Sequence, residues 1–208
     1  FGKRTAITGE SGGGKSTLLK LLLGYYPSVH GRIRLEEVDL KTLKPEVWQQ
    51  RCGAILQESR LFSDTLARNI ALGQERIEQE RLLQAVRLTH LQPLLDRMPL
   101  GLNTPVGRDG SSLSRGQEQQ VLLARLIYAN PEYLLMDEVT SSLDPFQEMM
   151  IWDELCEHFS GKTLIYVTHR LHALRSADRI LVMREGIITE TGSHEELLKR
   201  GGYYSFLM

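Results

Sequence analysis

The segment from Gly9 to Ser16 reads GESGGGKS and joins two runs of different character. The apolar run Arg4–Thr8 before it is typical of a buried strand, and Lys15–Leu23 after it is typical of a helix. Glycines at such a junction let backbone N–H groups curl around an anion, while the helix turns its positive end to the same point. The segment matches G-x-x-x-x-G-K-[ST] in full, the pattern of loops that bind nucleotide phosphates. We therefore expect a phosphate loop made of Gly9, Glu10, Ser11, Gly12, Gly13, Gly14, Lys15, Ser16 and Thr17.

Polar residues follow four short apolar runs that are expected to form buried parallel strands. Near-continuous hydrophobicity is what a strand covered on both faces requires, and alternating strands and helices favour a parallel sheet. In open α/β sheets the ligand lies beyond the carboxyl ends of the strands. The predicted strands are Arg4–Thr8, Gly53–Leu56, Tyr133–Met136 and Thr163–Thr168. In the same order, they are followed by the glycine loop, Gln57, Asp137-Glu138 and His169. The strands therefore predict a site at one edge of the sheet.

The chemistry expected at this edge is Mg²⁺-dependent hydrolysis of a phosphate bond. Lys15 would reach the β- and γ-phosphates, and the Ser16 hydroxyl would ligate Mg²⁺. Asp137 suits a carboxylate that faces the metal through water, and Glu138 suits the group that orients the attacking water. The alternative for this pair is an acidic surface turn.

Gln57 and His169 are weaker candidates when each is considered alone. Gln57 could bridge the metal or the water to the following helices, or it could be an ordinary polar residue at a strand end. His169 could act in catalysis or form a structural hydrogen bond. Their shared edge favours function. The predicted catalytic residues are Glu138, His169, Lys15 and Gln57, and the predicted metal-facing residues are Ser16, Gln57 and Asp137.

The middle of the chain changes from alternating elements to helices, which predicts a helical insertion into an α/β core. Helices are expected at Thr65–Leu72, Glu78–Leu88, Leu91–Arg97 and from Ser114 to Ala129. The predicted fold class is an α/β P-loop NTPase core with a mainly parallel sheet and an inserted α-helical subdomain. Residues 1–60 and 131–208 would form the core, and 61–130 the insertion.

Composition argues against several other classes of protein. The 25 basic and 26 acidic residues balance, so no nucleic-acid partner is expected. No apolar run approaches the roughly 20 residues that span a bilayer. The first residues lead directly into a strand, so no signal peptide is expected. Cys52 and Cys156 lack the spacing of metal ligands and are expected to be free thiols.

Taken together, these motifs resemble the nucleotide-binding domain of ATP-binding cassette (ABC) transporters, and the resemblance covers essentially the whole chain. The phosphate loop resembles the Walker A motif of that family, and Gln57 and His169 resemble its Q-loop and H-loop. Tyr133–Glu138 is similar to the Walker B motif with its catalytic glutamate. The remaining two matches are Leu113-Ser114-Arg115-Gly116-Gln117, which resembles the signature motif, and Ser142-Leu143-Asp144, which resembles the D-loop.

The resemblance implies an ATPase that uses ATP and Mg²⁺ and works as a head-to-tail dimer with a second nucleotide-binding domain. Each ATP would lie between the phosphate loop of one domain and the signature motif of the other, contacted there by Ser114, Arg115, Gly116, Gln117 and Asp144. The transmembrane domains of the transporter, fused or separate, would be partners. The domain would lie at the cytoplasmic face of the membrane.

Two stretches favour the exporter branch of the family. They are Leu61–Gly73 and the ending Gly192–Leu198; Met98–Gly107 is similar to members that secrete peptides or toxins. Family members also carry antiparallel strands upstream, with an aromatic residue that stacks on adenine. No residue here takes that role, so we expect those strands to be missing from this sequence.

The sequence departs from the family pattern at several places. Arg115 stands where the signature usually has glycine. Its side chain could hinder the closed dimer, which predicts weakened but not abolished hydrolysis; alternatively, its guanidinium could add positive charge near the γ-phosphate. Glu118 and Gln120 replace basic residues, and Arg108 replaces a frequent glutamate. The alternative function is a nucleotide-binding regulatory module with little turnover. A soluble ABC protein acting on DNA or the ribosome would need coiled-coil or basic insertions, which are not seen.

Overall fold

The computed structural model describes residues 2–107, 110 and 112–208, and these form two compact units. The first unit holds the chain up to Leu56 together with Pro131–Glu138 and Gly161–Met208. The second holds Gln57–Asn130 and Val139–Ser160. Each unit is described here by itself.

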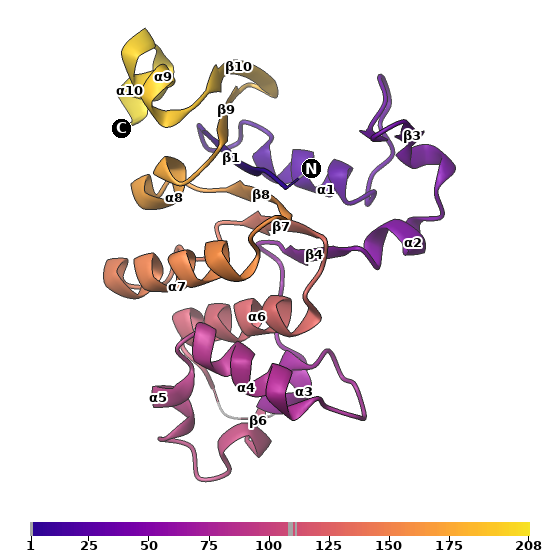
Figure 1. Ribbon diagram of the computed structural model, residues 1–208, viewed down its shortest axis with the longest axis vertical. Helices are drawn as coiled ribbons and strands as arrows, with labels where there is room; N and C mark the ends of the chain where they lie inside the picture. The colour runs from indigo at the N-terminus through magenta and orange to yellow at the C-terminus, as the bar shows by residue number, and fades with distance from the viewer. Residues whose placement is uncertain (1, 108–109, 111) are drawn as a thin grey trace. The chain divides into compact units, whose positions relative to one another are not determined.

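A six-stranded sheet is the centre of the first unit, and its strands lie side by side in the order β10-β9-β1-β8-β7-β4 (Figure 1). All neighbouring strands are parallel except β9 and β10, which form an antiparallel hairpin. This arrangement confirms the predicted α/β class with a mainly parallel sheet. The strands are β1 (Arg4–Gly9), β4 (Cys52–Ile55), β7 (Tyr133–Asp137), β8 (Thr163–Val167), β9 (Arg179–Arg184) and β10 (Ile187–Gly192).

The inner strands form as their apolar sequences predict, because both faces of the sheet are covered. All five residues of β7 are buried, and Leu134 and Met136 are completely inaccessible. Helix α1 (Lys15–Leu22) packs the 0%-exposed Leu19 into the same core as Ile7 of β1. The sheet edge that carries the carboxyl ends of β1, β7 and β8 is therefore held on a rigid, desolvated base.

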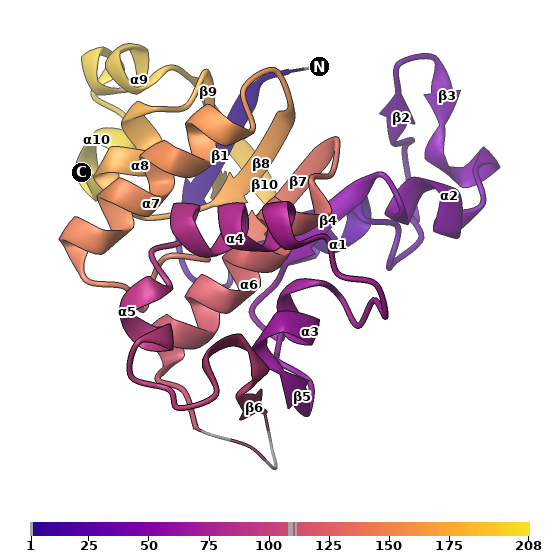
Figure 2. The same ribbon diagram turned by 60° about the horizontal axis from the view of Figure 1, so that its bottom comes forward.

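A small hairpin and a short helix extend the first unit beyond the sheet (Figure 2). The hairpin consists of β2 (Arg34–Leu35) and β3 (Val38–Asp39) and is followed by the 3₁₀ turn η1 (Leu40–Thr42) and by α2 (Pro45–Gln49). Trp48 of α2 donates its indole N–H to the carbonyl of Leu22 at 2.8 Å.

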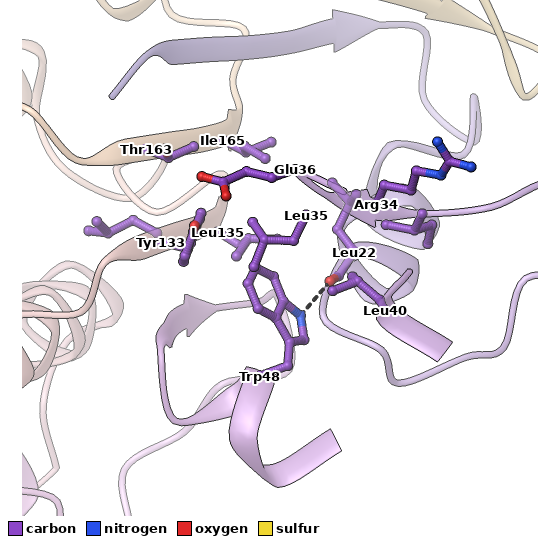
Figure 3. A pocket seen from close by; sticks show the side chains of 12 residues that line it. Leu22, Arg34, Leu35, Glu36, Leu40, Trp48, Tyr133, Leu135, Thr163 and Ile165 are labelled. Atoms are coloured by element: carbon purple, nitrogen blue, oxygen red, sulfur yellow. Dashed lines mark hydrogen bonds between the residues drawn. The ribbon is translucent and has the colours of Figure 1, made fainter. Parts of the chain in front are cut away.

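Beside Trp48 lies an apolar pocket of about 270 Å³ (Figure 3). The Trp48 ring stands 4.9 Å from the Tyr133 ring, centroid to centroid, and Leu35 and Ile165 help to line the pocket. The indole therefore anchors α2 to the end of α1 and to the start of β7.

The second unit is mainly helical, and its central helix is α6 (Arg115–Ala129). Residues of α6 from Gln120 to Tyr128 are mostly buried, and the helix packs alongside α4 and α3 (Figure 2). Two short strands, β5 and β6, pair antiparallel beside them. The other elements are β5 (Asp64–Thr65), α3 (Leu66–Ile70), α4 (Gln79–Leu88), α5 (Gln92–Leu95), η2 (Gly101–Asn103), β6 (Pro105–Val106) and α7 (Pro145–His158).

All four helices predicted in this unit are shorter in the structure, and two of them differ by more than one residue. Thr65 is the N-cap of α3 and accepts a hydrogen bond from the Arg68 N–H, so the helix begins one residue later. The helix ends at Ile70 because Leu72 and Gly73 both adopt positive φ, at 54° and 74°. The predicted helix Leu91–Arg97 is limited to Gln92–Leu95.

Helix α8 (Leu171–Arg175) precedes β9, and α9 (His194–Arg200) and α10 (Tyr203–Leu207) follow β10 at the end of the chain. The predicted capping box of α9 is present, with Ser193 and Glu196 each accepting the other's backbone N–H. In the described part of the chain, no helix is both long enough and apolar enough to cross a membrane.

Candidate functional site

The glycine loop forms the turn that its sequence predicts, between β1 and α1. Gly12 and Gly14 adopt positive φ of 77° and 89°, which residues with a Cβ rarely reach. A Cβ at Gly9 would collide with the Met183 carbonyl oxygen of β9. Gly14 is the N-cap of α1 and offers no side chain to cap it, so the first turn of that helix can turn its N–H groups to an anion.

Lys15 is buried at this loop, with only 8% of its surface exposed. Its ammonium donates to the carbonyls of Gly9 at 2.9 Å and Glu10 at 2.6 Å. Burial lowers the pKa of Lys15, and the charges of Glu138, Asp137 and Glu10 oppose that shift. The ammonium is thus a partly desolvated cation held by two loop carbonyls, and a phosphate can take their place.

The two acidic residues at the end of β7 lie in different environments. Asp137 is 4% exposed, whereas the Glu138 side chain is about one-third exposed. The Glu138 N–H still pairs with the Val167 carbonyl of β8 at 3.0 Å, yet its φ is 51°. A non-glycine residue in this region stores backbone strain of about 1–3 kcal/mol, and such strain is concentrated at functional sites.

Mg²⁺ prefers oxygen ligands and keeps several waters, and the residues present offer that type of donor. Asp137 and Ser16 provide a carboxylate and a hydroxyl at the ends of two elements of the same unit. Within the described residues, no three His, Cys, Asp or Glu side chains cluster as a metal cage.

His169 follows β8 and meets both β1 and β7 at the sheet edge. Its Nδ1 lies 3.5 Å from the Thr8 hydroxyl, and its Nε2 lies 3.5 Å from the Glu138 carboxylate. Burial lowers the pKa of His169, Lys15 lowers it further, and Glu138 opposes both. The structure thus brings Lys15, Asp137, Glu138 and His169 into one electrostatic group. Sequence analysis missed Thr8, whose only signal was a hydroxyl within a buried apolar run.

In the second unit, Ser114 begins α6 as its N-cap. The Gln117 N–H donates to the Ser114 hydroxyl at 3.2 Å, and the Ser114 N–H donates to the Gln117 side chain at 2.9 Å, which completes a capping box. Arg115 is exposed at the first helical position. A Cβ on Gly116 would lie 2.9 Å from the Ser142 carbonyl oxygen, so only glycine allows this close approach.

Two neighbouring glutamines on α6 bind two segments that lie near this helix start. Gln119 accepts from the Ser142 N–H at 2.9 Å and donates to the Ser141 hydroxyl at 3.3 Å. The buried Gln120 donates to the Thr89 carbonyl at 2.9 Å. Sequence analysis missed the roles of both residues, because their partners lie about 20 to 30 positions away.

These contacts surround a polar pocket of about 310 Å³ at the start of α6. Asp144 forms one wall and caps α7, accepting the N–H groups of Phe146 and Gln147 at 3.1 and 3.0 Å. The lining includes His90, Arg97, Ser114, Gln117, Asp144 and Gln147. Residues that the sequence assigned to the signature and D-loop motifs therefore share one pocket.

Gln57 is exposed and belongs to the second unit, where its carbonyl accepts from the Arg60 guanidinium at 2.9 Å. Arg108, one of the predicted departures from the family pattern, lies outside the described residues.

Comparison with known proteins gives a consistent set of relatives. The family model described as "ABC transporter" matches residues 1–141. ABC transporter B family member 13 of Arabidopsis thaliana is 39% identical over 207 residues, which are 100% of this chain and 17% of that protein. The ATP-dependent lipid A-core flippase of Saccharophagus degradans is 39% identical over 206 residues, 99% of this chain and 35% of the flippase.

A solved structure is similar over nearly the whole fold. The structure of a bacterial Atm1-family ABC exporter with ATP bound superposes with a TM-score of 0.92 at 36% identity, over 99% of this chain and 36% of that chain. The present chain thus spans well under two thirds of the length of these relatives.

Proposed function

The chain belongs to the ABC transporter family, and from that premise we propose that it hydrolyses ATP as the motor domain of an exporter. One observation carries the proposal: the glycine loop with its buried Lys15, the pair Asp137-Glu138 and His169 follow the neighbouring parallel strands β1, β7 and β8, and His169 Nε2 lies 3.5 Å from the Glu138 carboxylate. The names of the relatives, which include a flippase and an exporter, support export as the coupled process.

The residues predicted to bind and hydrolyse ATP have distinct proposed roles. The loop from Gly9 to Thr17 binds the phosphates through its N–H groups, and Lys15 leaves its two loop carbonyls to pair with the β- and γ-phosphates. Bound Mg²⁺ would neutralise the charge that develops on the phosphates, held by Ser16, by Asp137 through water and by Gln57. Glu138 accepts a hydrogen bond from the attacking water, and His169 lies beside it to hold the reacting groups.

The second unit supplies the surface for a second domain. Its helix start at Ser114, Arg115, Gly116 and Gln117, together with Asp144, would contact the nucleotide held by a facing domain in a head-to-tail dimer. The capping box uses the Ser114 oxygen as an acceptor, so its hydroxyl hydrogen stays available for a phosphate oxygen. The positive end of the 15-residue helix α6 favours the same anion.

From membership of the ABC transporter family we also propose the domain's partners and the bounds of its subdomains. Transmembrane domains, fused or separate, would couple to this domain at the cytoplasmic face of a membrane. Residues 1–60 and 131–208 are proposed as the ATPase core, and 61–130 as the inserted helical subdomain.

Steady-state ATP hydrolysis with Mg²⁺ tests the proposal, measured over a range of protein concentrations beside Glu138→Gln. We expect activity that rises faster than linearly with protein and is lost in the variant, while nucleotide still binds. Glu46→Gln, an exposed glutamate on α2, is the matched control and should keep the activity.

A regulatory module that binds ATP without turnover is the second candidate, and the exposed Arg115 at the start of α6 favours it. Nucleotide binding and dimerisation without measurable hydrolysis in the parent chain would support that candidate and contradict the motor.

A further inference from the structure

Asn69 is a completely buried amide that organises the segment after Gln57. Its Oδ1 accepts from the Phe62 N–H at 3.0 Å, and its Nδ2 donates to the carbonyls of Phe62 at 2.9 Å and Thr65 at 3.1 Å. One side chain thus replaces the backbone partners that this irregular segment lacks.

Arg125 of α6 clamps the same amide from the other side. Its Nε donates to the Asn69 carbonyl at 2.9 Å, and its Nη2 donates to Asn69 Oδ1 at 3.1 Å. The guanidinium also lies 5.0 Å from the centre of the Phe62 ring. Burial of the Arg125 guanidinium removes it from water and lowers its pKa. No carboxylate is among the contacts described for this side chain. The planar fork of arginine suits such a paired contact, and lysine cannot reproduce it.

The contacts continue from Arg125 to Gln57. Arg125 Nη1 reaches the Arg60 carbonyl at 3.5 Å, and the Arg60 guanidinium donates to the Gln57 carbonyl at 2.9 Å. In the other direction, α6 runs from Arg125 back to its capped start at Ser114, about 16.5 Å along a rigid helix. The Gln57 segment and the start of α6 are therefore tied to one helix within one unit.

We propose that Arg125 and Asn69 are positioning residues, which fix the Gln57 segment to α6 so that Gln57 and the start of α6 at Ser114–Gln117 move as one piece. This inference rests on the proposed function, because it gives those two segments parts in ATP hydrolysis. Asn69 and Arg125 belong to the second unit, and the phosphate loop belongs to the first. Loss of the tie should therefore lower turnover and leave ATP affinity unchanged.

The test compares Arg125→Lys and Asn69→Ala with Arg81→Ala. Arg81 is a matched control: its guanidinium also donates to an α6 carbonyl, that of Tyr128, and lies 5.1 Å from the centre of the Tyr128 ring. It has no contact with the Gln57 segment among those described for it. We expect Arg125→Lys and Asn69→Ala to lower kcat at least about tenfold with KM nearly unchanged, since small displacements of reacting groups cost that much or more. Arg81→Ala should keep kcat even where it lowers the melting temperature equally.

Hydrogen exchange of residues 58–66 without nucleotide gives a readout that does not depend on activity. Exchange should rise in Arg125→Lys and Asn69→Ala and stay at the parent level in Arg81→Ala. Unchanged exchange, unchanged kcat, or an equal loss of kcat in Arg81→Ala would each overturn the inference. An inactive parent chain would instead contradict the proposed function, and the exchange result would still decide whether the tie exists.

Discussion

The Nε2 atom of His169 faces Oε1 of Glu138 at 3.5 Å, although the pKa of this histidine is lowered rather than raised. Burial and the nearby Lys15 outweigh the attraction of the carboxylate. The neutral imidazole is therefore the favoured form. Its Nδ1 can accept a hydrogen bond from the Thr8 hydroxyl while its Nε2–H donates to Glu138.

This arrangement predicts a pH dependence of stability that involves His169. An unfolded histidine titrates near about pH 6.5, above the lowered folded value, so the unfolded chain binds the proton first as the pH falls. The stability contributed is complete above about pH 6.5 and is lost as the pH falls through the folded pKa. We expect the melting temperature to decline less in His169→Gln than in the parent between about pH 7.5 and about pH 5.5. His194 has the same sign of shift but is present in both proteins, so parallel declines would contradict the role of His169.

Removal of the Lys15 ammonium is expected to weaken ATP binding. Hydrogen bonds to charged groups contribute about 1.5–3 kcal/mol, which corresponds to roughly a tenfold to hundredfold loss of affinity in Lys15→Ala. Titration calorimetry with ATP and Mg²⁺ measures this affinity. Lys20→Ala, further along the same helix, is the control, and equal affinities of the two variants would refute the assignment of Lys15.

A methyl group at Gly116 is expected to separate the two segments that meet there. Its carbon would lie 2.9 Å from the Ser142 carbonyl oxygen, so the backbone before Asp144 must shift. Gly116→Ala should reduce steady-state ATP turnover at least about tenfold through misplacement of that segment. ATP affinity of the dilute domain should stay at the parent value, and a parallel loss of binding would show that the effect is not local.

Substitution of Arg115 is expected to raise the ATPase rate, in contrast to Gly116→Ala. Its side chain is exposed, and the cap of α6 is made by Ser114 and Gln117, so Arg115→Gly leaves the cap intact. Glycine costs up to about 1 kcal/mol of helix propensity and less at a first turn. If the side chain hinders close approach of a facing domain, Arg115→Gly should raise the ATPase rate several-fold. An unchanged rate would mean that Arg115 does not limit hydrolysis.

The sheet and its polar edge could be predicted because their signals are local. Apolar strands such as Tyr133–Asp137 end in polar residues, and the glycine loop fixes one strand and one helix around a phosphate site. The fold class and the four strands of the edge are confirmed by the structure, with end points shifted by one residue.

Other features depended on partners distant in the sequence and could not be predicted. Gln119 and Gln120 are adjacent on α6, yet they bind two segments that are far apart in the sequence, at Ser142 and at Thr89. The pairing of Asp64 with Val106 joins strands of two residues each, too short for a periodic signal. The hairpin β2–β3 turns at Glu36, whose φ is 54°. A glycine at this position would have indicated the turn in the sequence, but a glutamate does not.

The positive φ of Glu138 has a consequence for the evolution of this chain in the laboratory. Glycine reaches that backbone region without strain, so Glu138→Gly relieves local strain while it removes the carboxylate. A selection that rewards only heat resistance would then enrich substitutions at this position and remove the carboxylate that we propose for hydrolysis. Directed evolution of a more heat-stable domain must therefore also select for ATP turnover in every round, because thermal stability and the proposed hydrolysis favour different residues at position 138.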